Sequence, residues 1–384
     1  MTDFDLAPYQ AAGLYDPAHE GAADRAELLA FLVEIGCTIE EMTAAHSRGR
    51  LFALAGDRII RPDRDRFTLA EVAAQVGAEE DVVRRAWRAF GLALRDHGDR
   101  VASPDDVDAL RTHVGLVAFF GEDAALSLAR VTASALSRLG EALSSTVRTA
   151  STNLDLDIHE SGSEITTARA FAGAASAVPA AGRMIDTIYR HHIESARMLF
   201  EQAVEAHPDR QIAMGIGFVD LCDFTALSGR LDSAKLAHLL TRFEEIATEV
   251  ATDCGSRAVK FIGDAVMFVA PNPVTVVHTA VSLMNHPDAG TSGLSARGGV
   301  AFGQVLAQDG DFFGPPVNLA SRLCSAAKPE TLLIADDLVE RIDGRWPLES
   351  VGELTLRGID APVPASALRI CMDETAEGAP AVGW

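Results

Sequence analysis

Two aspartates, each directly after a short apolar run, are the residues of this chain best suited to metal chemistry. Asp220 follows Phe218-Val219, and Asp264 follows Phe261-Ile262-Gly263. Both runs are typical of β-strands, and a carboxylate at the tip of a rigid strand can bind a divalent cation with little conformational freedom. Either aspartate alone fits an ordinary turn. As a pair on one sheet, they can hold the metal ions that a polyphosphate needs.

Residues 314–323 supply a second candidate group. Two prolines, Pro315 and Pro316, suit the first turn of a helix, which then carries Asn318 and Arg322 one turn apart on the same face. An amide and a guanidinium in this arrangement can hold a sugar oxygen and a phosphate. The same spacing also fits a solvated helix face, so spacing alone leaves both interpretations open.

Lys260 and Asp311 form a third candidate group, suited to reading a base. The chain has only three lysines against thirty arginines, which makes the ammonium group of Lys260 a distinctive feature. A donor and an acceptor placed together match the N1 atom and the amino group of adenine, whereas guanine needs the opposite arrangement. Each of the two residues by itself also fits a surface charge.

Hydrophobic periodicity shows which elements must position these residues. Residues 1 to about 206 have the apolar spacing of helices, and from about residue 211 short strands alternate with helices. The predicted helices of the first part are Arg25–Ile35, Leu69–Val76, Glu80–Leu92, Asp123–Val147 and Ile165–Ala175. The predicted strands of the second part are Ile212–Asp220, Ala258–Ile262, Ala265–Ala270, Ala296–Phe302 and Thr331–Ala335, separated by helices at Ser233–Thr252, Pro273–Asn285 and Val317–Ala327.

The order of the later elements, β-α-β-β-α-β, predicts a ferredoxin-like α/β sandwich. Ile262-Gly263-Asp264-Ala265 is predicted to be a tight hairpin turn with Asp264 at its tip. The fold class is therefore α+β, with a helical domain at residues 1–182, a linker helix at 183–206 and the sandwich domain at 207–384. A helix between two domains can transmit a state from one to the other, and it equally fits a simple connector.

Composition limits the classes of partner. The chain of 384 residues is 48% hydrophobic and carries a net charge of −22, which disfavours binding to the phosphate backbone of nucleic acid. No apolar run reaches the length of a membrane span, and no signal peptide is evident, so we expect a cytoplasmic protein. The five cysteines have no metal-finger spacing and fit reduced thiols.

Residues 211 to about 370 resemble the catalytic domain of class III nucleotidyl cyclases. Three segments carry the resemblance, in the family's order: Phe218–Thr225, Lys260–Met267, and Asp311–Gly314 followed by Val317–Arg322. Phe313 stands where many members have tryptophan, and Pro315-Pro316 replaces a more polar pair.

The resemblance implies an adenylate cyclase that converts ATP to 3′,5′-cyclic AMP and pyrophosphate with two divalent cations, Mg²⁺ or Mn²⁺. It implies that Asp220 and Asp264 bind the metals, that Lys260 and Asp311 select adenine, and that Asn318 and Arg322 stabilise the transition state. Arg357, in Leu356-Arg357-Gly358, stands where some members have a lysine that contacts the terminal phosphates. Family members are dimers whose active sites combine metal ligands of one chain with the base-reading and transition-state residues of the other.

The helical part resembles, in its architecture, the regulatory domain of soluble actinobacterial adenylate cyclases, some of which respond to pH. Histidine titrates near neutral pH, so protons are a candidate effector, and so is a small apolar ligand. The histidines of this part are His19, His46, His97, His113, His159, His191 and His192.

Two alternatives remain at this point. One is a guanylyl cyclase, which Lys260 and Asp311 disfavour. The other is a regulatory protein with a cyclase-like domain, because Phe67–Gly77 and Glu80–Leu92 have the pattern of a helix-turn-helix, with Arg84, Arg85 and Arg88 in its second helix.

Overall fold

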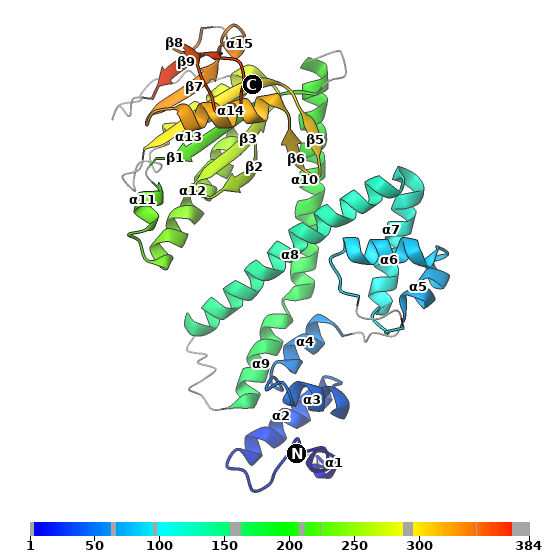
Figure 1. Cartoon of the computed structure of the whole chain (residues 1–384). Coiled ribbons are helices and arrows are strands. Elements are labelled where there is room, and N and C mark those ends of the chain that lie inside the picture. The colour runs from blue at the N-terminus through cyan, green and yellow to red at the C-terminus, as the bar shows by residue number, and fades with distance from the viewer. Residues whose placement is uncertain are drawn as a thin grey trace. The chain divides into compact units, whose positions relative to one another are not determined.

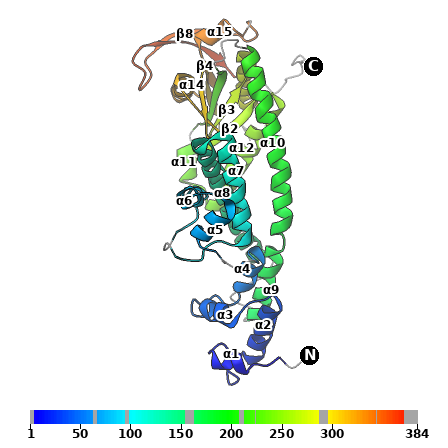
Figure 2. The ribbon, with the colours of Figure 1, turned by 90° about the vertical axis from the view of Figure 1, so that its right-hand side faces the viewer.

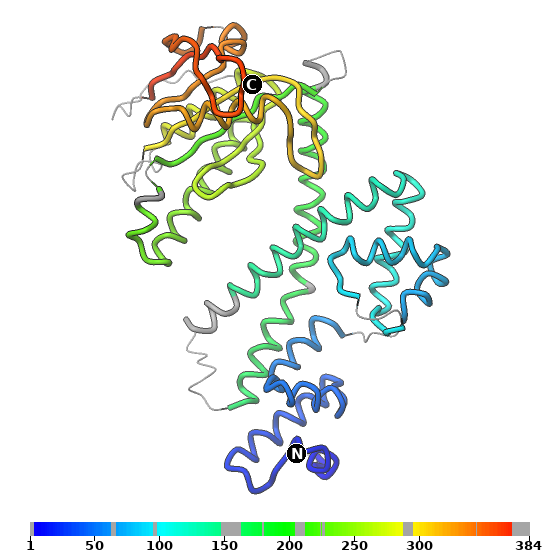
Figure 3. Tube along the Cα trace, in the orientation of Figure 1, coloured from blue at the N-terminus to red at the C-terminus, as the bar shows by residue number. Residues whose placement is uncertain are grey.

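The computed structural model describes residues 4–62, 67–94, 98–153, 163–206, 212–222, 224–286, 295–342 and 344–370, which Figure 3 traces in colour. The chain divides into two compact units, residues 1–190 and 191–384. The division lies inside helix α10 (Val178–Ala206), which contains the whole predicted linker helix 183–206. Residue 207, the predicted start of the sandwich domain, is outside the described residues.

Unit 1 contains two small helical cores, and the first is built from the start of the chain and a later helix. Leu28, Leu32 and Met42 pack against Ile165 and Ala168, so residues far apart in sequence share one core. The helices around it are α1 (Ala7–Ala11), α2 (Ala22–Glu34), α3 (Ile39–His46), α4 (Leu54–Ile60) and α9 (Glu164–Ala175).

The second core of unit 1 joins the predicted helix-turn-helix to the helix after it. Val72, Val83, Trp87 and Leu110 are buried together. The helices here are α5 (Leu69–Val76), α6 (Glu80–Ala89) and α7 (Pro104–Phe120), followed by α8 (Glu122–Asn153). Gly77 takes the left-handed conformation that ends α5, with φ of 71°, as expected for a turn between two helices.

Two arginines of the second helix of that motif, α6, are already neutralised. Arg84 pairs with Glu80, and Arg85 pairs with Asp81 and Glu122. These pairs lower the positive charge available for a phosphate backbone, which disfavours the DNA-binding alternative.

Unit 2 is a seven-stranded mixed sheet with helices on both faces (Figure 1). The strand order is β2-β3-β1-β4-β7-β9-β8, and a separate two-stranded sheet pairs β5 with β6. The strands are β1 (Ala213–Leu221), β2 (Arg257–Ile262), β3 (Ala265–Ala270), β4 (Ala296–Gln304), β5 (Leu306–Gln308), β6 (Asp311–Phe313), β7 (Thr331–Ala335), β8 (Glu349–Leu354) and β9 (Val363–Arg369). The helices are α11 (Phe224–Ser228), α12 (Ser233–Asp253), α13 (Pro273–Met284), α14 (Pro315–Ala326) and α15 (Asp336–Val339).

The first four strands of the sheet have the predicted ferredoxin-like arrangement. β1 pairs antiparallel with both β3 and β4, and β2 pairs antiparallel with β3. Phe268 and Val266 face the core under α12 and α13, whereas Met267 and Val269 face the core under α14. The end of α10 packs on this second face through Leu199 and Ala203 (Figure 2). The α+β prediction is therefore confirmed.

Two further observations concern the chain as a whole. Among the helices that the structure describes, none has a stretch long and apolar enough to cross a membrane. Four cysteines, Cys37, Cys222, Cys254 and Cys324, form no disulfide within the described part of the chain, and the fifth, Cys371, is outside it.

Candidate active site

Strand register brings Asp220 and Asp264 to one edge of the sheet. Asp220 lies opposite Ala265 in the β1–β3 pair, and Gly263-Asp264 forms the two-residue turn between β2 and β3. Gly263 has φ of 65°, a conformation that a side chain would strain, which explains the glycine at this place in the turn. The Leu221 amide donates to the Asp264 carbonyl at 3.2 Å. The predicted hairpin and its aspartate tip are therefore present.

The electrostatics of this edge favour a bound cation. Burial raises the pKa of Asp264, and the neighbouring Asp220 raises it further, although a backbone hydrogen bond and Arg297 act in the opposite direction. A partly buried carboxylate whose charged form is disfavoured by burial and by a neighbouring carboxylate is stabilised when a positive charge lies beside it.

Arg297 on β4 is a site residue that the sequence did not point to. It lies directly opposite Asp220 in the β1–β4 pair, and its Nε and Nη2 donate to Asp220 Oδ2 at 2.9 and 2.6 Å. This hydrogen bond is the largest cause of the raised pKa of Arg297. Because the chain is rich in arginine, the presence of an arginine at position 297 did not indicate a site residue. Only the strand register places Arg297 beside Asp220.

Asp220 and Asp264 fit a divalent cation that is shared with a substrate. No cluster of three or more histidine, cysteine, aspartate or glutamate side chains suited to a metal exists among the described residues. Mg²⁺ commonly takes one or two carboxylates and fills its other positions with water and substrate phosphates. A pair of carboxylates therefore suits a metal that arrives with a polyphosphate.

Lys260 and Asp311 are in direct contact within one chain. Lys260 Nζ donates to Asp311 Oδ2 at 2.5 Å, which joins strand β2 to strand β6 of the small hairpin. The other oxygen, Asp311 Oδ1, accepts from the Phe312 amide at 2.8 Å. Both side chains are about one-third exposed, at 36% and 28%, so a ligand can reach them.

Asn318 and Arg322 share the outer face of α14. Both are exposed, while Pro316, Ala320, Leu323 and Cys324 form the buried face of the helix. No hydrogen bond or ion pair within the described part of the chain occupies either side chain. The structure places the amide and the guanidinium together on one exposed helix face, as the spacing predicted.

Arg357 lies on the exposed turn between β8 and β9. No contact among the described residues joins it to Asp220, Lys260 or Asn318. The candidate residues therefore form three groups in one chain: Asp220 with Asp264 and Arg297 (called the metal edge below, after its candidate role), the Lys260–Asp311 pair, and the face of α14. Arg357 stands apart from them.

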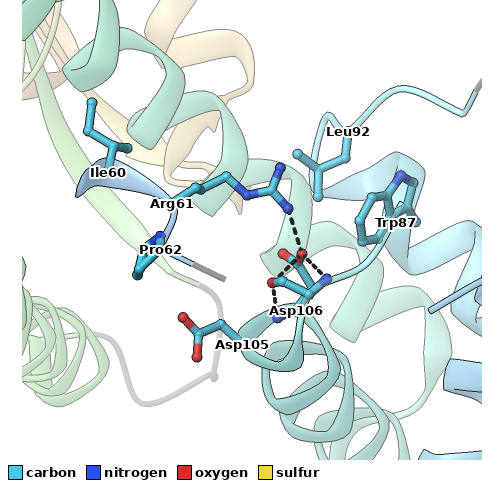
Figure 4. Close-up of a pocket in the computed structure, with 8 residues that line it drawn as sticks. Ile60, Arg61, Pro62, Trp87, Leu92, Asp105 and Asp106 are labelled. Atoms are coloured by element: carbon cyan, nitrogen blue, oxygen red, sulfur yellow. Dashed lines mark hydrogen bonds and ion pairs between the residues drawn. The ribbon is translucent and has the colours of Figure 1, made fainter. Parts of the chain in front are cut away.

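Unit 1 holds a separate cavity of about 330 Å³ between the end of α4 and helices α6 and α7 (Figure 4). Its lining mixes Trp87 and Leu92 with Asp105 and the Arg61–Asp106 ion pair, in which the nitrogen and oxygen are 3.0 Å apart. The lining therefore combines apolar side chains with three charged ones, Arg61, Asp105 and Asp106.

The fold and these three groups define a nucleotidyl cyclase of class III, and comparisons with known proteins agree. The model of the adenylate cyclase regulatory domain matches residues 9–196, and that of the adenylate and guanylate cyclase catalytic domain matches residues 206–365. An uncharacterized protein of Mycobacterium tuberculosis (strain H37Rv) is 45% identical over 95% of this chain and 94% of its own length.

A pH-sensitive adenylate cyclase of Mycobacterium tuberculosis (strain CDC 1551) is 30% identical over 93% of this chain and 90% of its own. The crystal structure of the adenylyl cyclase CyaB from P. aeruginosa is 24% identical, covers 41% of this chain and 93% of its own, and has a TM-score of 0.38. The chain belongs to the class III adenylate cyclases, with an adenylate cyclase regulatory domain ahead of the catalytic domain.

Proposed function

We propose that this protein converts ATP to 3′,5′-cyclic AMP and pyrophosphate at sites shared between two copies of the chain. The observation that carries the choice of ATP is the Lys260–Asp311 pair. An ammonium and a carboxylate side by side offer a donor to adenine N1 and an acceptor to its amino group. Guanine presents the opposite pattern and would leave both protein charges without a partner.

The metal edge binds the triphosphate end of the substrate in this proposal. Divalent cations held by Asp220 and Asp264 supply Lewis-acid chemistry, lowering the pKa of the ribose 3′-hydroxyl and neutralising the phosphates. Arg297 keeps the Asp220 carboxylate in one orientation through its two donors. The two-residue turn between β2 and β3 fixes the backbone position of Asp264.

The face of α14 stabilises charge at the reacting centre. The ribose 3′-hydroxyl loses its proton to solvent, its oxygen bonds to the α-phosphorus, and the bond from that phosphorus to pyrophosphate breaks. Arg322 donates to the α-phosphate as charge develops there, and Asn318 orients the ribose. We assign Arg357, on its exposed turn, to the terminal phosphates.

In this proposal, a homodimer brings the metal edge of one chain next to the Lys260–Asp311 pair and the α14 face of the other. Exposed leucines on α8 support such an assembly, because Leu136, Leu139 and Leu143 follow the three- and four-residue spacing of a helix-pairing seam.

Unit 1 regulates the catalytic domain in this proposal, and protons are the effector. His113 on α7 is 2% exposed, and its Nε2 has no hydrogen-bond partner among the described residues. The groups that face it are the Phe90 ring, edge-on at 5.8 Å, and Glu122, which is tied to Arg85. Burial lowers the pKa of His113, with Glu122 opposing. His97 and His159 are outside the described residues.

Cyclic-nucleotide formation from ATP and from GTP, with Mg²⁺ or Mn²⁺, tests the function directly. We expect cyclic AMP from ATP and little product from GTP. Asp220→Ala should abolish turnover, while Asp253→Ala, at the exposed end of α12, should keep wild-type rates. Full activity in purified Asp220→Ala protein, or a preference for GTP, would overturn the assignment.

A further inference from the structure

Arg257 is a half-buried arginine that none of the three site groups uses. It begins strand β2, three residues before Lys260. Its Nε is buried and donates to no acceptor among the described residues, and burial lowers the pKa of its guanidinium. Burying a charged hydrogen-bond donor without an acceptor lowers the stability of the fold. The position of Arg257 therefore suggests a functional role.

A β-bulge turns Arg257 toward the same face of the sheet as Lys260. Residues three apart in a regular strand point to opposite faces. The β2–β3 register shifts between Ala258 and Lys260, so Arg257 lies opposite Val269 and Lys260 lies opposite Met267. Both of these β3 residues belong to the core under α14, which also contains Phe312.

Arg257 contacts the hairpin that carries Asp311. Its guanidinium carbon lies 5.3 Å from the centre of the Phe312 ring, a cation–π distance. Phe312 is 1% exposed, and its amide holds Asp311 Oδ1. Strand β6 belongs to a different sheet from β2, so these side-chain contacts stand in place of a backbone ladder between the two strands.

We propose that Arg257 is a positioning residue for adenine selection, which docks the β5–β6 hairpin through Phe312 so that Asp311 faces Lys260. The bulge gives β2 two cations on one face with separate roles: Arg257 fixes the hairpin, and Lys260 meets the base. This inference rests on the proposed function, since it assigns the Lys260–Asp311 pair to adenine.

Arg257→Met tests the inference, because methionine keeps an apolar stem and removes the guanidinium. We expect kcat/KM for ATP to fall about tenfold, mainly through a higher KM. GTP turnover should change about twofold or less, because the variant disturbs the position of Asp311 relative to Lys260, which only adenine requires. The ratio of ATP to GTP use should therefore fall about fivefold. Arg257→Lys, which retains a cation near the ring, should recover part of that ratio.

Arg341→Met is the matched control. Arg341 also lies 5.3 Å from a phenylalanine ring centre, that of Phe302, and has no contact with Lys260 or Asp311 among the described residues. Its loss should leave the ATP-to-GTP ratio unchanged. Equal losses for both nucleotides in Arg257→Met would show a purely structural role and overturn the inference.

Amide hydrogen exchange supplies a readout that does not depend on activity. Residues Leu306–Phe313 should exchange faster in Arg257→Met than in wild type or Arg341→Met, because the hairpin loses its anchor. Unchanged exchange would contradict the docking role, and faster exchange with an unchanged nucleotide ratio would contradict the selection role. If the wild-type protein made no cyclic AMP, the proposed function would fail on its own, whatever the exchange showed.

Discussion

The two units of this chain differ in what their polar side chains contact. In unit 2, charged residues far apart in sequence meet: Asp220 pairs with Arg297 on the adjacent strand β4, and Lys260 pairs with Asp311 of the β5–β6 hairpin. Unit 1 also has long-range pairs, such as Arg25 with Glu164, but its capping boxes are local: Thr68 with Glu71, and Ser103 with Asp106. Long-range charge pairs at a sheet edge fit a site for chemistry, whereas caps stabilise the helices that carry two small cores.

The largest effect that this comparison predicts is the loss and recovery of turnover in mixed dimers. Asp220→Ala and Asn318→Ala should each reduce the rate at least about a thousandfold, because one removes a metal ligand and the other a group at the reacting centre. A one-to-one mixture should regain about a quarter of wild-type activity, since half the dimers would hold one intact site. Cyclic AMP assays measure this, and no recovery at all would argue against shared sites.

A second prediction concerns the charge pair that the sequence did not point to. Arg297→Gln should lower kcat about tenfold or more, because Asp220 loses both donors that orient it. The same change should tighten Mn²⁺ binding in the absence of nucleotide, since a competing cation is gone. Electron paramagnetic resonance of free Mn²⁺ measures the affinity, with exposed Arg369→Gln as the control. Weaker Mn²⁺ binding in Arg297→Gln would show that the arginine supports the metal.

Exchanging the base-reading pair gives a third test. Lys260→Glu with Asp311→Cys removes the pattern that matches adenine and supplies an acceptor for guanine, so the ATP-to-GTP ratio should fall about a hundredfold. Competition between the two nucleotides in one reaction measures this ratio directly. An unaltered preference for ATP would remove Lys260 and Asp311 from base selection.

The smallest predicted effect lies in unit 1 and concerns stability. His113 has a lowered pKa in the fold, so below its usual value of about 6.5 the unfolded chain binds a proton that the folded chain resists. Stability of unit 1 should therefore fall as pH falls from 7.5 to 5.5, and His113→Phe should remove most of that slope. Calorimetry should show a difference of a few degrees in Tm.

His278→Phe, an exposed histidine on α13 in unit 2, is the matched control and should keep the wild-type slope. If His113→Phe also alters the pH profile of cyclic AMP formation, the regulatory part of the proposal gains support. An unchanged activity profile together with the expected change in stability would assign His113 to the core alone.

The sequence predicted the parts of the site that depend on local pattern. Strand β3 and helix α5 have the predicted bounds, and the Gly263-Asp264 turn follows from a glycine between two apolar runs. Arg297 and Arg257 were missed because their roles arise from register: one faces Asp220 across a strand pair, and the other is turned by a bulge. Hydrophobic alternation along the sequence shows neither the strand register nor the position of a β-bulge. Because the chain has thirty arginines, residue type alone did not single out Arg297 or Arg257.

Under the proposed function, the contact between Lys260 and Asp311 has a consequence for how the site rejects a wrong base. Before any base arrives, each side chain is the other's ligand, at 2.5 Å. An entering base must separate them, and it is accepted only if it replaces the lost contact on both sides. A base that satisfies one partner leaves the other as a bare, partly buried charge. Discrimination then comes from the Lys260–Asp311 contact, which a wrong base breaks without replacing it.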